Sequence, residues 1–99
     1  MKLLYAIKNV ETQHRALLER IHTALELRMD WLNDREPESN GMVYDDWSEK
    51  VDDLQEILDC VESLLEETDS DTQTELIEEI QSLTDTYQAI HGGLSRLTL

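Results

Sequence analysis

Apolar residues recur at alternating steps of four and three in three separate stretches of this chain. The stretches cover residues 3–24, 47–65 and 76–97. This spacing places the apolar side chains on one face of an α-helix, because residues three and four apart lie one above the other along a helix. The chain also holds no Phe, three Gly and one Pro, a composition far from that of a sheet-rich sandwich or barrel. The sequence therefore predicts an all-α protein.

Local signals divide the chain into three helices within a single domain over 1–99. The turn-forming segment Pro37–Gly41 predicts a loop over about 34–43, after a first helix over about 3–33. A short polar side chain lies three residues before a glutamate at Asp46 and again at Thr72, the spacing of a capping box at a helix start. Asp69, Ser70 and Asp71 are also good N-cap residues for the third helix. The pair Gly92–Gly93 favours a helix end near residue 91. We expect the second helix over about 46–67, the third over about 72–91, and a short C-terminal tail.

The expected architecture is a three-helix bundle, or a long helical hairpin with a third helix packed against it. Periods near 3.5 residues and short connections favour antiparallel neighbours with shallow, coiled-coil-like crossing angles. A first helix of about thirty residues would be roughly 40 Å long, well beyond two partners of about twenty residues. Its broad apolar stripe, with Leu17 and Leu18 adjacent, would stay partly uncovered in a monomer. We therefore expect a homodimer; the alternative is a compact monomer whose first helix is shorter or kinked.

Acidic residues are concentrated in the second and third predicted helices. Eighteen carboxylates and one lysine lie between Glu36 and Ser95, a net charge of −17, whereas the first 35 residues sum to +1. Like charges three and four residues apart on a helix repel, and a large net charge weakens the compact state. Such a surface therefore favours a basic partner. The candidate partner-binding residues are Glu49, Asp52, Asp53, Glu56, Asp59, Glu66, Glu75, Glu78 and Glu79.

This acidic surface predicts a protein that imitates nucleic acid. Duplex DNA carries about one negative charge per 1.7 Å of its axis, and two neighbouring helices covered with carboxylates would present a similar field. We expect a small protein-binding inhibitor, of the type made by phages and mobile elements, that occupies a basic, nucleic-acid-binding protein. It would not bind nucleic acid directly. Its binding should weaken as ionic strength rises.

The sequence alone leaves further interpretations of the acidic residues open. They could simply solvate the surface, but a general pressure for solubility should also reach the first helix, which keeps Arg15, Arg20, Arg28 and Arg35. They could instead pair with those arginines within or between chains. The alternative function is a helical adaptor, chaperone or assembly scaffold. In that case the apolar stripe of the first helix would bind a partner helix, and binding would tolerate salt.

Two pairs of carboxylates have a spacing that metal enzymes use. Glu49 and Asp52 lie three residues apart on the second helix, and Glu75 and Glu78 do so on the third, so the four could hold Mg²⁺ between helices. At these positions the chain resembles the all-helical nucleotide pyrophosphohydrolases, which implies metal-dependent phosphate chemistry. However, Lys50 is the only base at hand to hold a triphosphate, and such spacings arise readily by chance among so many acids. We expect no enzymatic activity, no resident metal and no cofactor.

Histidine and tryptophan residues are expected to have structural roles. His14 falls on the apolar face of the first helix, where it should belong to the core or an interface, whereas His22 should face solvent. His91 should cap the last turn of the third helix, because a partial positive charge suits a helix C-terminus. Trp31 and Trp47 should meet at one end of the bundle.

Two features bear on the compartment in which the protein works. No apolar run exceeds Leu3–Ile7, so we expect neither a signal-peptide core nor a membrane span. Cys60 is the single cysteine and cannot form an internal disulfide, which is typical of a reducing compartment. It should act as a small hydrophobic residue at the edge of the core. A cytoplasmic location is expected.

Overall fold

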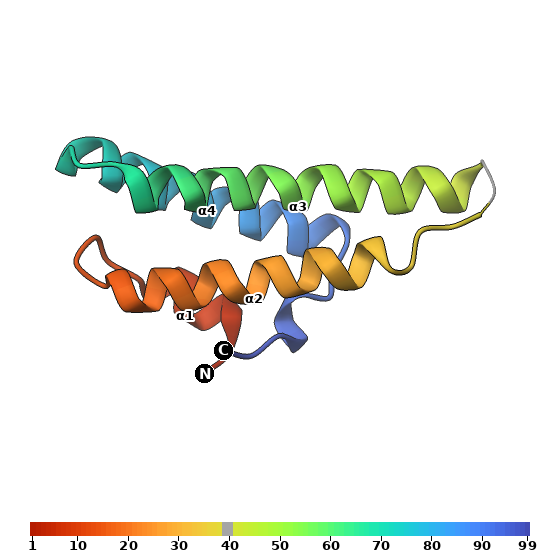
Figure 1. Cartoon of the computed structure of the whole chain (residues 1–99), viewed down its shortest axis with the longest axis horizontal. Coiled ribbons are helices and arrows are strands. Elements are labelled where there is room, and N and C mark those ends of the chain that lie inside the picture. Colours follow the sequence, from red (N-terminus) through yellow and green to blue (C-terminus); the bar gives the residue numbers. More distant parts are fainter. Residues whose placement is uncertain (39–40) are drawn as a thin grey trace.

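Within residues 1–38 and 41–99, which the structure describes, the chain folds into four α-helices and one short 3₁₀ helix (Figure 1). The structure is a computed structural model. No β-strand occurs in the described residues, so the all-α prediction is confirmed. Residues 39 and 40 of the predicted loop lie outside the described residues. The elements are α1 (Leu3–Asn9), α2 (Arg15–Asn33), α3 (Met42–Glu66), α4 (Ser70–Ile90) and the 3₁₀ helix η1 (Leu94–Arg96).

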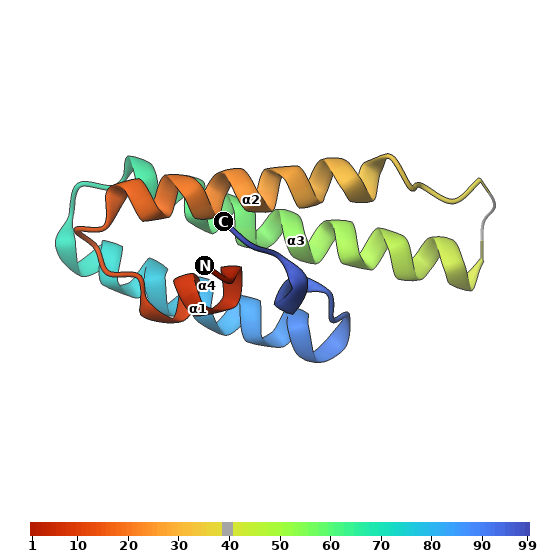
Figure 2. The same cartoon turned by 90° about the horizontal axis from the view of Figure 1, so that it is seen from below.

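Helix α3 packs against both α2 and α4 and runs antiparallel to them (Figures 1 and 2). The short α1 folds back beside α4, and the molecule measures 45 × 24 × 21 Å along its principal axes. A single cluster of buried leucine, isoleucine and valine side chains joins all five elements. Each such side chain contributes about 1.5–3 kcal/mol when it leaves water, so this shared core is the main stabilising term. The buried residues of α3 are Leu54, Ile57, Leu58, Val61 and Leu64.

The prediction of a single first helix over 3–33 is wrong, because the segment forms two helices joined by a turn. The backbone of Val10 is extended, with φ −68° and ψ 143°. Across the turn the Glu11 N–H donates to Nδ1 of His14, at 3.2 Å. The turn folds α1 back so that Leu3, Ile7 and Val10 become buried. That burial outweighs the few helical hydrogen bonds lost, and it removes the long uncovered helix on which the expectation of a homodimer depended.

The starts of α3 and α4 differ from the sequence prediction by a few residues. Helix α3 begins at Met42 after Gly41. Asp46 therefore lies inside the helix, where it pairs with Lys50 at 3.1 Å, and does not cap the helix start. Helix α4 begins at Ser70. Its N-cap is Asp69, whose carboxylate accepts hydrogen bonds from the backbone N–H of Thr72 at 3.0 Å and from its hydroxyl at 2.8 Å. Of the candidate N-cap residues, Asp69 is therefore the cap and Thr72 donates to it.

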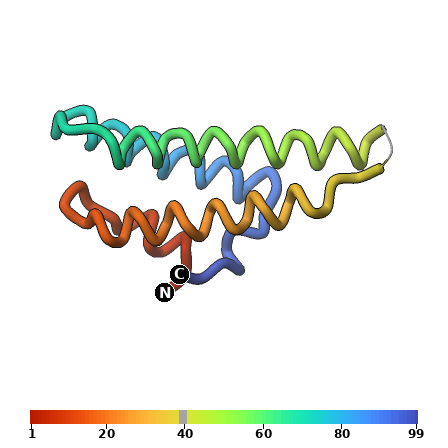
Figure 3. Tube along the Cα trace, viewed as in Figure 1, coloured from red at the N-terminus to blue at the C-terminus, as the bar shows by residue number. Residues whose placement is uncertain are grey.

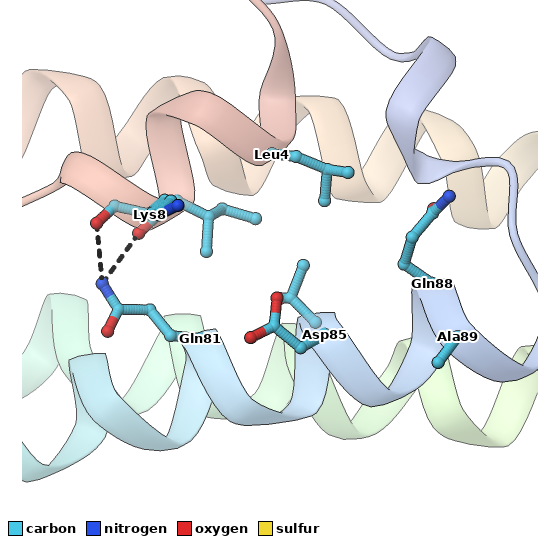
Figure 4. Close-up of a pocket in the computed structure, with 8 residues that line it drawn as sticks. Leu4, Lys8, Gln81, Asp85, Gln88 and Ala89 are labelled. Carbon is cyan, nitrogen blue, oxygen red and sulfur yellow. Dashed lines mark hydrogen bonds between the residues drawn. The ribbon is translucent and has the colours of Figure 1, made fainter.

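Two glutamines of α4 hold α1 and the C-terminal residues in place. The Gln81 side-chain amide donates to the carbonyl oxygens of Ile7 and Lys8, at 3.1 and 3.2 Å (Figure 4). Oε1 of Gln88 accepts from the backbone N–H groups of Leu94 and Ser95, at 3.0 and 3.2 Å. These bonds satisfy backbone groups at the end of α1 and the start of η1 that no helix can pair.

The two ends of the chain meet, as the trace in Figure 3 shows. The Leu3 N–H donates to the Leu97 carbonyl at 2.9 Å, and the Leu99 N–H donates to the Met1 carbonyl at 2.8 Å. Lys2 and Thr98 form an isolated antiparallel bridge between them. The last residues therefore lie against α1 and along the side of α2.

Candidate functional site

Helix α3 is acidic around its whole exposed side. It carries nine carboxylates and a single base, Lys50. Eight of the nine carboxylates are exposed, and Asp53 is half-buried. The sequence pattern accounts for this surface. The buried positions of α3 recur at steps of three and four, and none of them is an acid.

The acidic surface extends onto α4 beside Cys60. Burial raises the pKa of the Cys60 thiol, and the negative charges of Glu79, Glu56 and Asp59 raise it further. Carboxylates of both helices therefore gather around this half-buried thiol. We call the acidic face the surface formed by Glu49, Asp52, Asp53, Glu56, Asp59 and Glu66 of α3 with Glu75 and Glu79 of α4.

Glu78 is the one predicted partner-binding residue that lies elsewhere. It lines a cavity of about 360 Å³ together with Val10, Glu11 and Gln13, so it faces the turn between α1 and α2. Adjacent residues on a helix point about 100° apart, and Glu78 and Glu79 therefore belong to different sides of α4.

Most carboxylates of the acidic face have no positive partner. In the described part of the chain, the ion pair that involves α3 is Asp46 with Lys50 at 3.1 Å, while Glu62 and Asp53 contact the imidazoles of His22 and His91 at 3.1 and 2.7 Å. Seven members of the acidic face have neither an ion pair nor a histidine contact over residues 1–38 and 41–99: Glu49, Asp52, Glu56, Asp59, Glu66, Glu75 and Glu79.

The arginines of the first predicted helix do not neutralise this face. Arg15 pairs with Glu19 on its own helix, at 3.7 Å. Arg28 and Arg35 each place their guanidinium 3.9 Å from the centre of the Trp31 ring. Within residues 1–38 and 41–99, no ion pair joins these arginines to the acids of α3 or α4.

The four carboxylates compared with the pyrophosphohydrolases do not converge on one site. Because α3 and α4 are antiparallel, Asp53 lies opposite His91 and Cys60 lies opposite Glu79. Glu49 and Asp52 are therefore near the end of α4, whereas Glu75 and Glu78 are near its start, roughly 20 Å further along the axis. The metal arrangement that this resemblance implied is absent from the described structure.

The structure instead brings Glu49 and Asp53 together with His91, with their nearest ligand atoms all within 4.8 Å of one another. Nε2 of His91 bonds Oδ2 of Asp53 at 2.7 Å, and the imidazole side chain is only 2% exposed. One imidazole and two carboxylates form a donor set for a divalent cation, although binding would require His91 to leave Asp53. As the residues stand, this contact fastens the end of α4 to α3. His91 is the C-cap of α4, as predicted, and its imidazole also contacts Asp53, 38 residues away along the chain.

Two cavities flank these elements. One of about 190 Å³ lies between α3 and α4 and is lined by Glu49, Asp53 and Glu56 of α3 and by Leu83, Thr86, Tyr87 and Ile90 of α4. The other, of about 530 Å³, lies between α1 and α4 (Figure 4). Its only charged lining residues are Lys8 and Asp85, and neither cavity gathers a nucleophile with a base.

Several single-residue predictions need correction. His14 is exposed in the turn before α2 and belongs to no core. His22 is half-buried, bound to Glu26 and Glu62 across α2 and α3. Trp47 does plug the end of the α2–α3 pair, since its indole N–H donates to the Leu32 carbonyl at 2.7 Å. Trp31 instead lies on the outer side of α2, 40% exposed.

Comparison with known proteins identifies no relative. No helix in the described residues is long and apolar enough to cross a membrane. No protein-family model, no curated protein and no solved structure matches the chain.

Proposed function

We propose that this protein is a small inhibitor whose acidic face occupies a basic, nucleic-acid-binding protein in place of nucleic acid. The observation that supports the proposal is the row of exposed, unpaired carboxylates on α3, held in register by a buried apolar core. Helix α3 is about 37 Å long and so presents about one carboxylate per 4 Å, close to the roughly 3.4 Å between charges along one DNA strand. A groove that binds the nucleic-acid backbone with Lys and Arg would meet a similar field.

The physical reason for expecting a partner is the repulsion between the carboxylates of the acidic face, which persists when no partner is bound. Asp52, Glu56 and Asp59 lie three and four residues apart on one side of α3, where like charges are unfavourable by a few tenths of a kcal/mol per pair. A basic partner turns that repulsion into attraction. It should also be captured quickly at low salt, where the Debye length is long and a charged surface steers the approach of an oppositely charged partner.

The central experiment reverses charge on α3 without touching its core. Asp52, Glu56 and Asp59 are changed together to Lys, and the buried Leu54 and Leu58 stay in place. We expect circular dichroism to show unchanged or improved folding, while proteins captured from a host lysate at low salt are lost. The native protein should release those partners at high salt and in the presence of a short DNA duplex.

A matched control separates the position of the charges from their number. Changing Glu26, Asp30 and Asp34 to Lys alters the net charge by the same amount but acts on α2 and its C-terminal end, where all three residues are exposed. This variant should keep the partner. Equal binding by the folded α3 variant, or a partner that duplex DNA cannot displace, would contradict the inhibitor proposal.

The other predictions from the sequence stay proposals. A helical adaptor, chaperone or assembly scaffold would keep its partner at high salt and would not respond to the α3 variant. Coiled-coil-like packing between the long helices, a homodimer and a cytoplasmic location likewise stay predictions. Analytical ultracentrifugation at micromolar concentration tests the homodimer directly, since a monomer sediments with a mass of 11.5 kDa.

A further inference from the structure

A groove of different chemistry runs between α2 and the C-terminal residues. One part has a volume of about 460 Å³ and is lined by Ala16, Ala24, Leu27 and Leu99 among others. It continues into a second part of about 300 Å³ that shares Ala24 and Leu27 and reaches Trp31. Leu27 is 64% exposed, so the floor of the groove holds large apolar side chains that the chain itself leaves uncovered.

The charged side chains of this groove are mainly arginines without carboxylate partners. Arg20 lines the first part, and Arg28 and Arg96 line the second. None of the three forms an ion pair in the described residues, although the chain holds 23 acidic residues and only eight lysines and arginines. The lining carboxylate, Glu19, is already paired with Arg15.

Arg28 shows most directly that an acceptor is missing. Its Nε is buried and has no hydrogen-bond partner among the described protein groups. Its guanidinium and that of Arg35 both lie over the Trp31 ring, which concentrates positive charge at one end of the groove. Arg28 also forms no ion pair in the described residues, so a carboxylate that a partner brings to the part of its guanidinium lining the groove would gain a charge-assisted hydrogen bond.

We propose that this groove binds an acidic amphipathic helix of another protein. From Ala16 to Trp31 the groove follows α2 for about 22 Å, the length of roughly four helical turns. Apolar side chains at steps of three and four would cover Leu27 and the neighbouring alanines, and carboxylates on the flanks of the helix would meet Arg20, Arg28 and Arg96. Affinity would come from the apolar floor and orientation from the arginines.

Two other occupants fit the groove less well. Nucleic acid could offer phosphates to the arginines, but its charged backbone has no apolar face to cover Leu27 and would leave the apolar floor wet. A second copy could offer its acidic face, but Asp52, Glu56 and Asp59 have no apolar side chain among them to cover Leu27. An acidic amphipathic helix satisfies both the charges and the apolar surface. The proposal does not depend on the inhibitor function, because it concerns the opposite chemistry on a different helix.

The test uses fluorescein-labelled helical peptides of 16 to 20 residues on the full chain. Each peptide carries leucines at alternating steps of three and four, and its remaining positions are glutamate in one set and lysine in a second set of identical leucine pattern. We expect the glutamate peptides to bind, as measured by the fluorescence anisotropy of their label, and to change the fluorescence of Trp31. Trp47→Phe keeps Trp31 as the sole tryptophan for this reading.

Two substitutions locate the site. Leu27→Asp places a charge on the apolar floor and should weaken binding about tenfold, the effect of losing one interface anchor. Val43→Asp is the matched control, since Val43 is an equally exposed apolar residue at the start of α3, away from the groove. It should change binding less than twofold. Arg20→Glu together with Arg96→Glu should weaken the glutamate peptides and strengthen the lysine peptides.

Three results would overturn the proposal. The first is failure of every glutamate peptide to bind, and the second is equal binding of the glutamate and lysine sets. The third is a doubled sedimenting mass that Leu27→Asp returns to that of a monomer, which would assign the groove to a second copy of this chain. Partner capture through the acidic face is measured separately with the α3 variant, so failure here leaves the proposed function unaffected.

Discussion

Replacing Thr84 with valine should stabilise this protein. Thr84 is 2% exposed in the middle of α4, and its Oγ1 has no hydrogen-bond partner among the protein groups that the structure describes. The hydroxyls of Thr23 and Thr74, by contrast, donate to the carbonyl oxygen four residues earlier, each at 3.1 Å. A buried polar group without a partner is unfavourable by about 1–3 kcal/mol, and valine has nearly the same shape without the hydroxyl.

The expected gain is therefore about 1–3 kcal/mol in the free energy of unfolding, because valine and threonine have similar helix propensities. In a domain of this size each kcal/mol moves Tm by roughly 4–8 °C, which thermal melts followed by circular dichroism resolve easily. Urea titration gives the free energy itself. Thr84→Ser, which keeps the hydroxyl and removes a buried methyl group, should instead lower stability by about 1 kcal/mol.

Thr74→Val is the matched control, because Thr74 is exposed on the same helix and its hydroxyl is already bonded. Its effect should stay within about 0.5 kcal/mol. A clear loss of stability in Thr84→Val, with an unchanged urea m-value, would refute the reasoning. It would mean that the Thr84 hydroxyl has a hydrogen-bond partner in the folded protein whose loss outweighs the gain from removing a buried polar group.

Three further predictions concern packing, capping and the thiol. Leu58→Ala should lower the free energy of unfolding by about 2–5 kcal/mol in urea titration, whereas Leu83→Ala should cost less because Leu83 is only half-buried. Asp69→Ala should lower Tm at neutral pH. The hydrogen bonds from Thr72 hold the pKa of Asp69 below its ordinary value, so this difference should persist above the ordinary aspartate range and vanish as pH falls through the lowered pKa. Burial and the nearby carboxylates raise the pKa of Cys60, so alkylation by iodoacetamide at pH 8 should be slow, and Glu79→Gln should lower that pKa and accelerate it.

The fold class follows from the sequence, but the path of the first forty residues does not. The steps of four and three identify helices because they decide which side chains can be buried together, and this holds for α2, α3 and α4. The turn at Val10–His14 carries no Gly or Pro to reveal it. It exists because Leu3 and Ile7 gain burial against α4 and η1, a tertiary effect that no local window contains.

The acidic face was predictable from composition and helix periodicity, since charge and spacing alone place its carboxylates outside the core. Contacts between helices were not. Nothing in the sequence pairs His91 with Asp53, because the register of α3 against α4 depends on where each helix begins. The same register separates Glu49 from Glu75, so the four carboxylates compared with the pyrophosphohydrolases do not meet. The groove was missed because Leu27 breaks the four-three pattern, and an apolar residue off the core stripe is the signal that could have found it.

The meeting of the two chain ends sets an order on folding. On the ribosome, α2, α3 and α4 emerge as sequence neighbours and can pack as each one appears. Helix α1 is made first, yet the residues that cover Leu3 lie at Leu94 and Leu97, almost a full chain length later. Helix α1 can pack against α2 and α4 as they appear, but the contacts of Leu3 with the C-terminal residues can form only after those residues have been synthesised. During that interval Leu3 lacks part of its cover, and transiently exposed apolar surface of this kind makes partly folded chains prone to aggregate.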